Sequence, residues 1–146
     1  YVTFNYRENH WNIGTLARLS GVDAGVFTYP LMVSSTGYIY EHEVGFSYDS
    51  ASVYAETGPV QLGNGDNIMS VRQVVPDEQT LGEAVVSFKT RNYPTGTQSS
   101  FGPYTAANPT SVRFSGRQVN MRVTGDTLAD WRVGVMRLEA VPSGKR

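Results

Sequence analysis

The sequence predicts an all-β protein built from antiparallel strands. Apolar and polar residues alternate with a period of two between clusters of turn residues. These runs recur about every ten residues without a long helical segment between them, which is typical of a sandwich, a barrel or a propeller. The composition agrees, because 40% of the 146 residues are hydrophobic, 12% are aromatic and none is cysteine. A chain of this length can bury a real core as one domain or two small ones.

In the first part of the chain, residues 1–5 and 38–44 are predicted to be strands. The alternation along 38–44 places Tyr38, Tyr40, His42 and Val44 on one face. The sequence Asn-Gly-Asp-Asn at 64–67 then predicts a turn, because Asn and Gly tolerate positive φ. We expect the boundary between two segments, 1–66 and 67–146, at this turn, although the two can pack as one compact domain. Weak helical signals are confined to residues 14–20 and 126–131.

The second part shows stronger strand patterns. Residues 68–75 place Met69, Val71, Gln73 and Val75 on one side, and 84–91 turn Ala84, Val86 and Phe88 to one side. We expect 92–110, which is rich in Thr, Ser, Gly and Pro, to be a long connection. The clearest pair covers 111–124 and predicts a hairpin that turns at Gly116-Arg117. A final strand at 132–141 points Met136, Leu138 and Ala140 inward.

The charge is distributed unevenly along the chain. Residues 1–71 carry two basic and seven acidic side chains (net −5), whereas residues 72–146 carry ten basic and six acidic ones (net +4). This asymmetry suggests a partner or, more simply, a solvated basic sheet face. Arg113, Arg117 and Arg122 lie along the expected hairpin, with Arg113 and Arg122 outward together. They suit an interface or a non-specific phosphate contact. Sequence-specific binding of a nucleic acid is not expected, because no aromatic residue on that face could stack on a base.

The search for reactive groups gives no strong candidate. Glu41 and Glu43 could hold a divalent cation with Asp49 or Asp66, but an exposed strand face explains them more simply. No calcium-loop, H-E-x-x-H, P-loop or Gly-x-Ser-x-Gly pattern occurs. We therefore expect no enzyme activity, no cofactor, no metal and no membrane contact.

Aromatic residues are plentiful and suggest either packing or recognition. The tyrosines of the first part are typical of a sugar-binding platform or a protein interface, but cross-strand packing is the simpler expectation; they are Tyr29, Tyr38, Tyr40, Tyr48 and Tyr54. We expect Trp11 and Trp131 to be core anchors.

Residues 58–146 resemble the C-terminal part of the nozzle (tail-hub) proteins of short-tailed bacteriophages. The resemblance is carried by Glu56-Thr-Gly-Pro-Val-Gln-Leu-Gly-Asn-Gly-Asp, Val75-Pro-Asp-Glu-Gln-Thr-Leu-Gly, Phe88-Lys-Thr-Arg-Asn-Tyr-Pro, Arg113-Phe-Ser-Gly-Arg-Gln-Val-Asn-Met-Arg-Val, Asp130-Trp-Arg-Val-Gly-Val-Met-Arg-Leu-Glu and Pro142-Ser-Gly-Lys-Arg. Upstream, Gly25-Val-Phe-Thr-Tyr-Pro and Gly37-Tyr-Ile-Tyr-Glu-His-Glu-Val-Gly are similar to the final propeller-type blade of such proteins. The resemblance thus implies an antiparallel β-sandwich preceded by a propeller-blade-like β-meander, as a piece of a longer protein.

The resemblance also implies a structural role in the virion. Nozzle proteins form a sixfold ring below the portal and adaptor and help to retain the packaged genome, and they have no catalytic residues to carry over. The implied partners are other copies of the chain, neighbouring tail or adaptor proteins and, non-specifically, DNA. Structural roles would fall to Gly116 in a turn, Trp131 in the core, Gly134 beside it, and Arg117 paired with a carboxylate.

Two other classes of function stay open from the residues alone. The tyrosine-rich stretch is compatible with a carbohydrate- or receptor-binding β-sandwich. A hydrolase stays open because the members of a Ser-His-Asp triad need not be close in sequence. It has the least support of the three, because no nucleophile motif is present.

Overall fold

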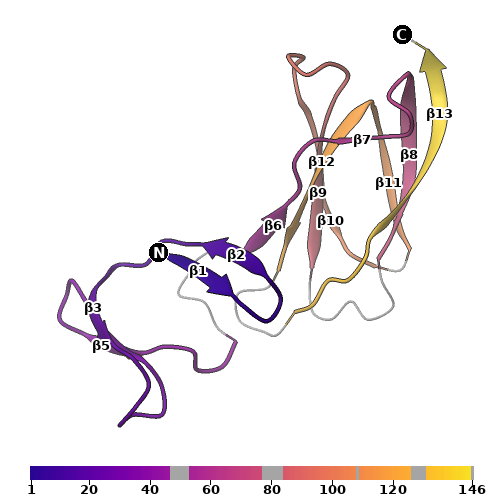
Figure 1. The fold of residues 1–146 in the computed structure, drawn as a ribbon. Coiled ribbons are helices and arrows are strands. Elements are labelled where there is room, and N and C mark those ends of the chain that lie inside the picture. Colours follow the sequence, from indigo (N-terminus) through magenta and orange to yellow (C-terminus); the bar gives the residue numbers. More distant parts are fainter. Residues whose placement is uncertain (47–52, 77–83, 108, 126–130, 146) are drawn as a thin grey trace. The chain divides into compact units, whose positions relative to one another are not determined.

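The computed structural model describes residues 1–46, 53–76, 84–107, 109–125 and 131–145. It is all-β in these residues, with antiparallel strands throughout (Figure 1). The chain divides into two compact units, Tyr1–Gly45 and Phe46–Arg146, which we describe separately.

The N-terminal unit consists of two small open sheets. Strands β1 (Val2–Asn5) and β2 (His10–Ile13) form a hairpin, and β3 (Arg18–Val22), β4 (Leu31–Ser34) and β5 (Ile39–Glu41) form a three-stranded meander. The helical turn suggested for residues 14–20 is therefore wrong, because this stretch leads into β3. A propeller blade has four strands in one sheet, so the blade-like nature of this meander stays a prediction.

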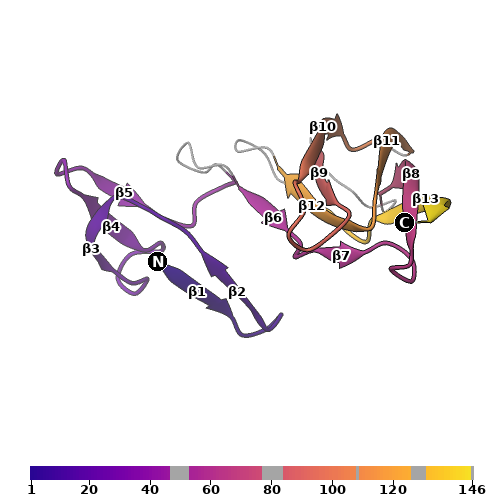
Figure 2. The same cartoon turned by 90° about the horizontal axis from the view of Figure 1, so that it is seen from above.

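The C-terminal unit is the predicted antiparallel β-sandwich. Its strands are β6 (Tyr54–Glu56), β7 (Val60–Gln61), β8 (Asn67–Val75), β9 (Val85–Arg91), β10 (Ser99–Thr105), β11 (Thr110–Gly116), β12 (Gln118–Thr124) and β13 (Arg137–Lys145). One sheet has the order β10-β9-β12-β6, with β7 also paired to β12, and the other has the order β11-β8-β13. Seen from above, the two sheets lie opposite each other as two layers (Figure 2).

The hydrophobic core lies between these two sheets. Strand β9 and the residue before it alternate as predicted, with Ala84, Val86 and Phe88 buried. Phe88 packs against Phe114 of the opposite sheet, with 4.7 Å between ring centroids. Met136, which directly precedes β13, and Leu138 and Ala140 on β13 pack against the core, as the alternation predicted. These inward faces explain why apolar and polar residues alternate along the sandwich strands.

The inward face of β8 differs from the prediction. Val71 and Val74 are buried, whereas Val75 is only half-buried. The reason is an irregularity at Arg72, where the pairing with both neighbouring strands shifts its register. A bulge of this kind interrupts strict alternation, so the side chains beyond it change faces.

The observed division of the chain lies at residues 45/46 and not at the expected 66/67. Strands β6 and β7 precede residue 66, yet both pair with β12 in the sandwich. The turn at 64–67 connects β7 in one sheet to β8 in the other, so it is internal to the C-terminal unit. A turn signal alone does not distinguish a domain boundary from a change of sheet.

Strands β11 and β12 do not form the predicted hairpin. They follow one another directly, but β11 belongs to one sheet and β12 to the other. The residue between them, Arg117, therefore marks a corner where the chain changes sheet. Gly116 is needed there for close approach rather than for positive φ, because an added Cβ would lie 2.9 Å from the Cβ of Thr90.

Two further expectations are wrong. The segment 92–110 is not only a connection, because it contains β10, which pairs with β9 along the edge of the sheet. Trp11 is not a core anchor, because 69% of its surface is exposed and its ring only stacks on Phe4, with 4.5 Å between centroids.

Candidate functional site

The three arginines predicted to lie along one hairpin are separated by the sandwich. Arg113 is exposed on β11, and Arg122 lies on β12 in the opposite sheet. Because exposed side chains of the two sheets face away from each other, Arg113 and Arg122 do not stand outward together as predicted. Arg117 lies at the corner between them. The predicted set is therefore three separate environments and not one surface.

Arg117 has a structural environment. Its Nη2 donates a hydrogen bond to the carbonyl oxygen of Gly65, and its guanidinium lies 5.8 Å from the centre of the Tyr93 ring. The backbone carbonyl of Arg117 also accepts a 2.8 Å hydrogen bond from the amide of Leu62. These contacts join the corner between the sheets to the turn that precedes β8. The expected carboxylate partner of Arg117 is thus replaced by a backbone carbonyl.

Arg122 takes part in a small charged cluster on the other sheet. Its guanidinium stacks on Tyr54 at 3.6 Å from the ring centre and lies 3.9 Å from a carboxylate oxygen of Glu56. The Nζ of Lys89 donates a 3.2 Å hydrogen bond to the same carboxylate. Arg122 already has an aromatic ring and a carboxylate as partners, so it is poorly placed to bind an external anion.

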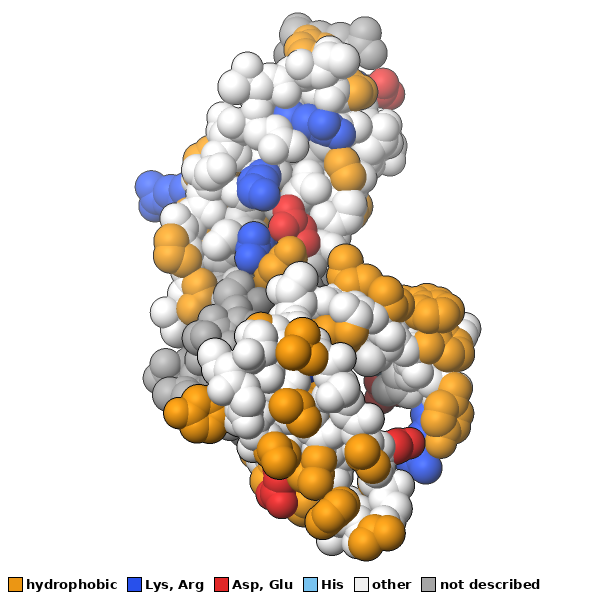
Figure 3. Space-filling model, turned by 90° about the vertical axis from the view of Figure 1, so that its left-hand side faces the viewer, with side chains coloured by type: hydrophobic (Ala, Val, Ile, Leu, Met, Phe, Trp, Pro, Cys, Tyr) orange, Lys and Arg blue, Asp and Glu red, His pale blue; other side chains and the backbone are white. Residues whose placement is uncertain are grey.

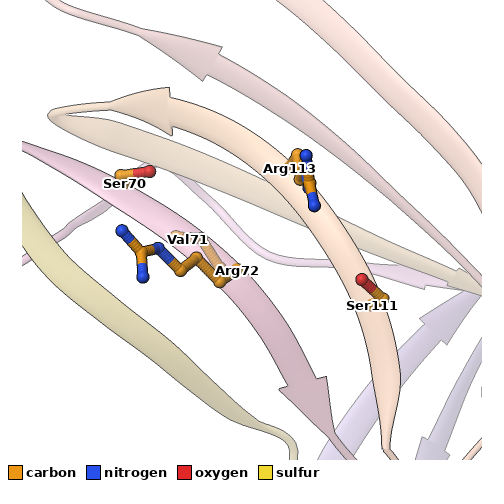
Figure 4. Close-up of a pocket in the computed structure, with 5 residues that line it drawn as sticks. All are labelled: Ser70, Val71, Arg72, Ser111 and Arg113. Carbon is orange, nitrogen blue, oxygen red and sulfur yellow. The ribbon is translucent and has the colours of Figure 1, made fainter.

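Arg113 lines an open hollow on the outer face of the β11-β8-β13 sheet. The hollow has a volume of about 440 Å³ and is lined by Ser70, Val71, Arg72, Ser111 and Arg113 (Figure 4). Three of these residues come from β8 and two from β11, so the pairing of the two strands brings them together. The sequence pattern had pointed to Arg113 but not to Arg72. The only available signal was that Ser70 and Arg72 occupy the polar positions of the predicted strand 68–75.

The other two residues with predicted structural roles lie near the start of β13. Trp131 is half-buried and packs against the core of the sandwich. An added Cβ at Gly125 would collide with the indole of Trp131, so glycine is required opposite this ring. Gly134 is exposed and precedes β13.

The N-terminal unit exposes most of its large apolar side chains. Ser34 is the only buried residue among the described residues 1–46. Ile13 is 84% exposed and Val26 is 99% exposed. Orange hydrophobic side chains are accordingly spread over the surface of this unit in Figure 3. The unit therefore has no apolar core of its own.

The tyrosines of the first part are exposed. Tyr29, Tyr38, Tyr40 and Tyr54 all have exposed side chains, and Tyr48 lies outside the described residues. The guanidinium of Arg18 stacks on Tyr40, 4.0 Å from the ring centre, and Arg18 also donates a 3.0 Å hydrogen bond to Nε2 of His42. The expectation of cross-strand packing is therefore met only in part, because Tyr40 and Tyr54 each stack on an arginine of another strand, Arg18 and Arg122, while their rings stay exposed.

The described residues contain no group of three or more His, Asp or Glu side chains that could hold a metal ion. Strand β5 ends at Glu41, and Glu43 has positive φ, so the expected alternation of the two carboxylates along one strand does not occur. Asp49, one of their suggested companions, lies outside the described residues. The weak helical signal at 126–131 falls almost entirely outside them as well.

Comparisons with known proteins give no further assignment. No family model, no curated protein and no solved structure matches the chain. In the part of the chain that the structure describes, no helix has the length and apolar character needed to cross a membrane.

Proposed function

We propose that this chain is a structural module of a phage tail nozzle. In this proposal it acts in the virion through contacts with other copies of itself in a ring and with neighbouring tail or adaptor proteins, and it helps to retain or channel the genome. The observation that supports it most is the exposed apolar surface of the N-terminal unit, together with the complete core of the sandwich.

The physical argument starts from the stability of small sheets. An isolated two-stranded hairpin is marginally stable in water, and three strands need an apolar face that is packed against something. The N-terminal unit has one two-stranded and one three-stranded sheet, and neither sheet contains a buried apolar side chain. Large exposed apolar patches on a folded protein mark interaction surfaces. A subunit of an assembly would cover this surface with its neighbours.

The distribution of charge supports contacts between unlike surfaces. The first half of the chain carries a net charge of −5 and the second half +4. Copies arranged head to tail bring the acidic part of one subunit to the basic part of the next, and such heterologous contacts form a ring when the rotation between subunits closes. Electrostatic attraction of this kind weakens with added salt.

Sedimentation velocity over a range of micromolar concentrations tests the proposal. We expect concentration-dependent oligomers in low salt, and we expect Ile13→Ser combined with Val26→Ser to weaken their association at least tenfold. Val135→Ser is the matched control, because Val135 is also exposed (69%) but lies in the sandwich unit. A chain that stays monomeric at every concentration, or equal losses for both variants, would contradict the proposal.

A second candidate function has one observation in its favour. Tyr38 and Tyr40 are exposed near β5, and exposed aromatic rings form the platforms on which sugars stack. A carbohydrate- or receptor-binding sandwich predicts saturable binding on a glycan array. That binding should be lost in Tyr38→Ala and retained in Tyr93→Ala, because Tyr93 is an exposed tyrosine of the other unit.

A further inference from the structure

The hollow on the outer face of the β11-β8-β13 sheet contains two neighbouring arginines. At this point the register shifts, so that Val112 and Arg113 on β11 lie opposite Arg72 alone on β8. Val112 is buried, whereas Arg72 and Arg113 are both exposed on the outer face. The irregularity is thus the local feature that places the two arginines on one face of adjacent strands, although their side chains leave the sheet in different directions (Figure 4).

Neither guanidinium has a compensating partner among the residues that the structure describes. Within the described part of the chain, Arg72 and Arg113 form no ion pair and no hydrogen bond with a side chain. Glu139, an exposed carboxylate on the neighbouring strand β13, pairs with neither of them. Like charges opposite each other on adjacent strands destabilise a sheet. An anion bound between them would remove this repulsion.

The hollow also supplies hydroxyl donors. Ser70 precedes Arg72 on the same face of β8, and Ser111 stands beside Arg113 on β11. Figure 4 shows the Arg72 side chain reaching back along β8 toward Ser70, while Arg113 and Ser111 lie on β11. A guanidinium presents several N–H donors in a fixed plane and binds the oxygens of phosphate in pairs. Serine hydroxyls supply further single donors.

We propose that Arg72, Arg113, Ser70 and Ser111 form a binding site for a tetrahedral phosphate group. The group is either a free inorganic phosphate or a phosphodiester of a nucleic-acid backbone, since the two share the same oxygen chemistry. The contacts involve no base-reading or aromatic side chain, so a nucleic acid would be held without sequence preference. This site rests on the sandwich alone and does not depend on the proposed role in a phage tail.

The first experiment titrates the full chain with inorganic phosphate at constant ionic strength, followed by NMR of the arginine Nε–H groups. We expect the Arg72 and Arg113 signals to shift together and saturably. Arg72→Gln and Arg113→Gln should each weaken phosphate binding about tenfold, because each removes a charge-assisted hydrogen-bond donor. Arg7→Gln is the matched control, because it removes the same charge from an exposed site in the other unit.

The second experiment measures binding to a short mixed-sequence DNA duplex by fluorescence anisotropy at several salt concentrations. If the ligand is a phosphodiester, each arginine variant should lower the slope of log K against log salt by about 1. Binding of free phosphate without binding of DNA would support the site and assign it to a small anion. The proposal would be overturned if neither ligand bound, if the variants bound as tightly as the parent, or if Arg7→Gln had an equal effect. Circular dichroism verifies that each variant is folded.

Discussion

Truncating Phe88 to alanine tests the description of the sandwich core. Phe88 is 1% exposed, and its ring centroid lies 4.7 Å from that of Phe114 and 6.3 Å from that of Tyr104. Burying such a side chain contributes about 1.5–3 kcal/mol. The cavity left behind adds a further cost, so we expect Phe88→Ala to lower the free energy of unfolding by about 3–5 kcal/mol.

The contribution of the aromatic pair can be separated by a double-mutant cycle. We expect Phe88→Ala and Phe114→Ala to be non-additive, with a coupling of about 0.5–1.5 kcal/mol, because either variant alone already removes the ring contact. Urea unfolding followed by far-UV circular dichroism and by the fluorescence of Trp131, which packs against this core, provides the measurement.

The control is Tyr93→Ala, which removes an aromatic ring that is 54% exposed in the same unit. Its expected cost is at most about 1 kcal/mol, the value of an exposed contact between a ring and a guanidinium. A loss below about 1 kcal/mol for Phe88→Ala, or equal losses at Phe88 and Tyr93, would refute the assignment of the core.

Three further predictions concern the corner and the charged cluster. Gly116→Ala should lower the free energy of unfolding by about 1–3 kcal/mol, because its Cβ would lie 2.9 Å from that of Thr90, whereas Gly25→Ala meets no atom within 4 Å and should be neutral in the same urea titration. Arg117→Met should speed amide hydrogen exchange in the turn at 64–67, because the turn loses the hydrogen bond that the arginine donates to the carbonyl oxygen of Gly65. Unchanged exchange in this turn would contradict the structural role of Arg117. Glu56→Gln should cost less than about 1 kcal/mol in low salt and almost nothing in high salt, because its ion pairs are partly exposed; a cost that persists in high salt would show another origin.

The sequence predicted the sandwich strands where one face is buried and the other solvated. Strand β9 and the inward side chains of β13 follow from period-two alternation, because the hydrophobic effect assigns every second residue to the core. Strand β10 was missed because its residues are mostly small and polar and include Pro103. Proline is compatible with a strand at the edge of a sheet, where a missing N–H removes no ladder bond, and β10 lies at such an edge.

The candidate site was predicted only in part. The pattern placed Arg113 on an outward face, which the structure bears out. Its neighbour Arg72 was not foreseen, because the two residues are distant in sequence and only the pairing of β8 with β11 brings them together. Arg113 and Arg122 were wrongly placed on one face, because alternation within each strand gives no information on whether consecutive strands share a sheet. Trp11 was misplaced because a large apolar residue suggests a core even in a unit that has none.

The pairing of β8 with β13 has a consequence for how the chain reaches its native state. Strand β8 forms the centre of its sheet, and β13 pairs with it from Lys145↔Asn67 to Arg137↔Val75. These partners are far apart along the chain, so closing them costs loop entropy before any contact is gained, and such topologies fold slowly. Until residues 137–145 emerge during synthesis, one edge of β8 stays open to other chains. Removal of residues 137–145 would therefore promote aggregation and not only lower the stability of the fold.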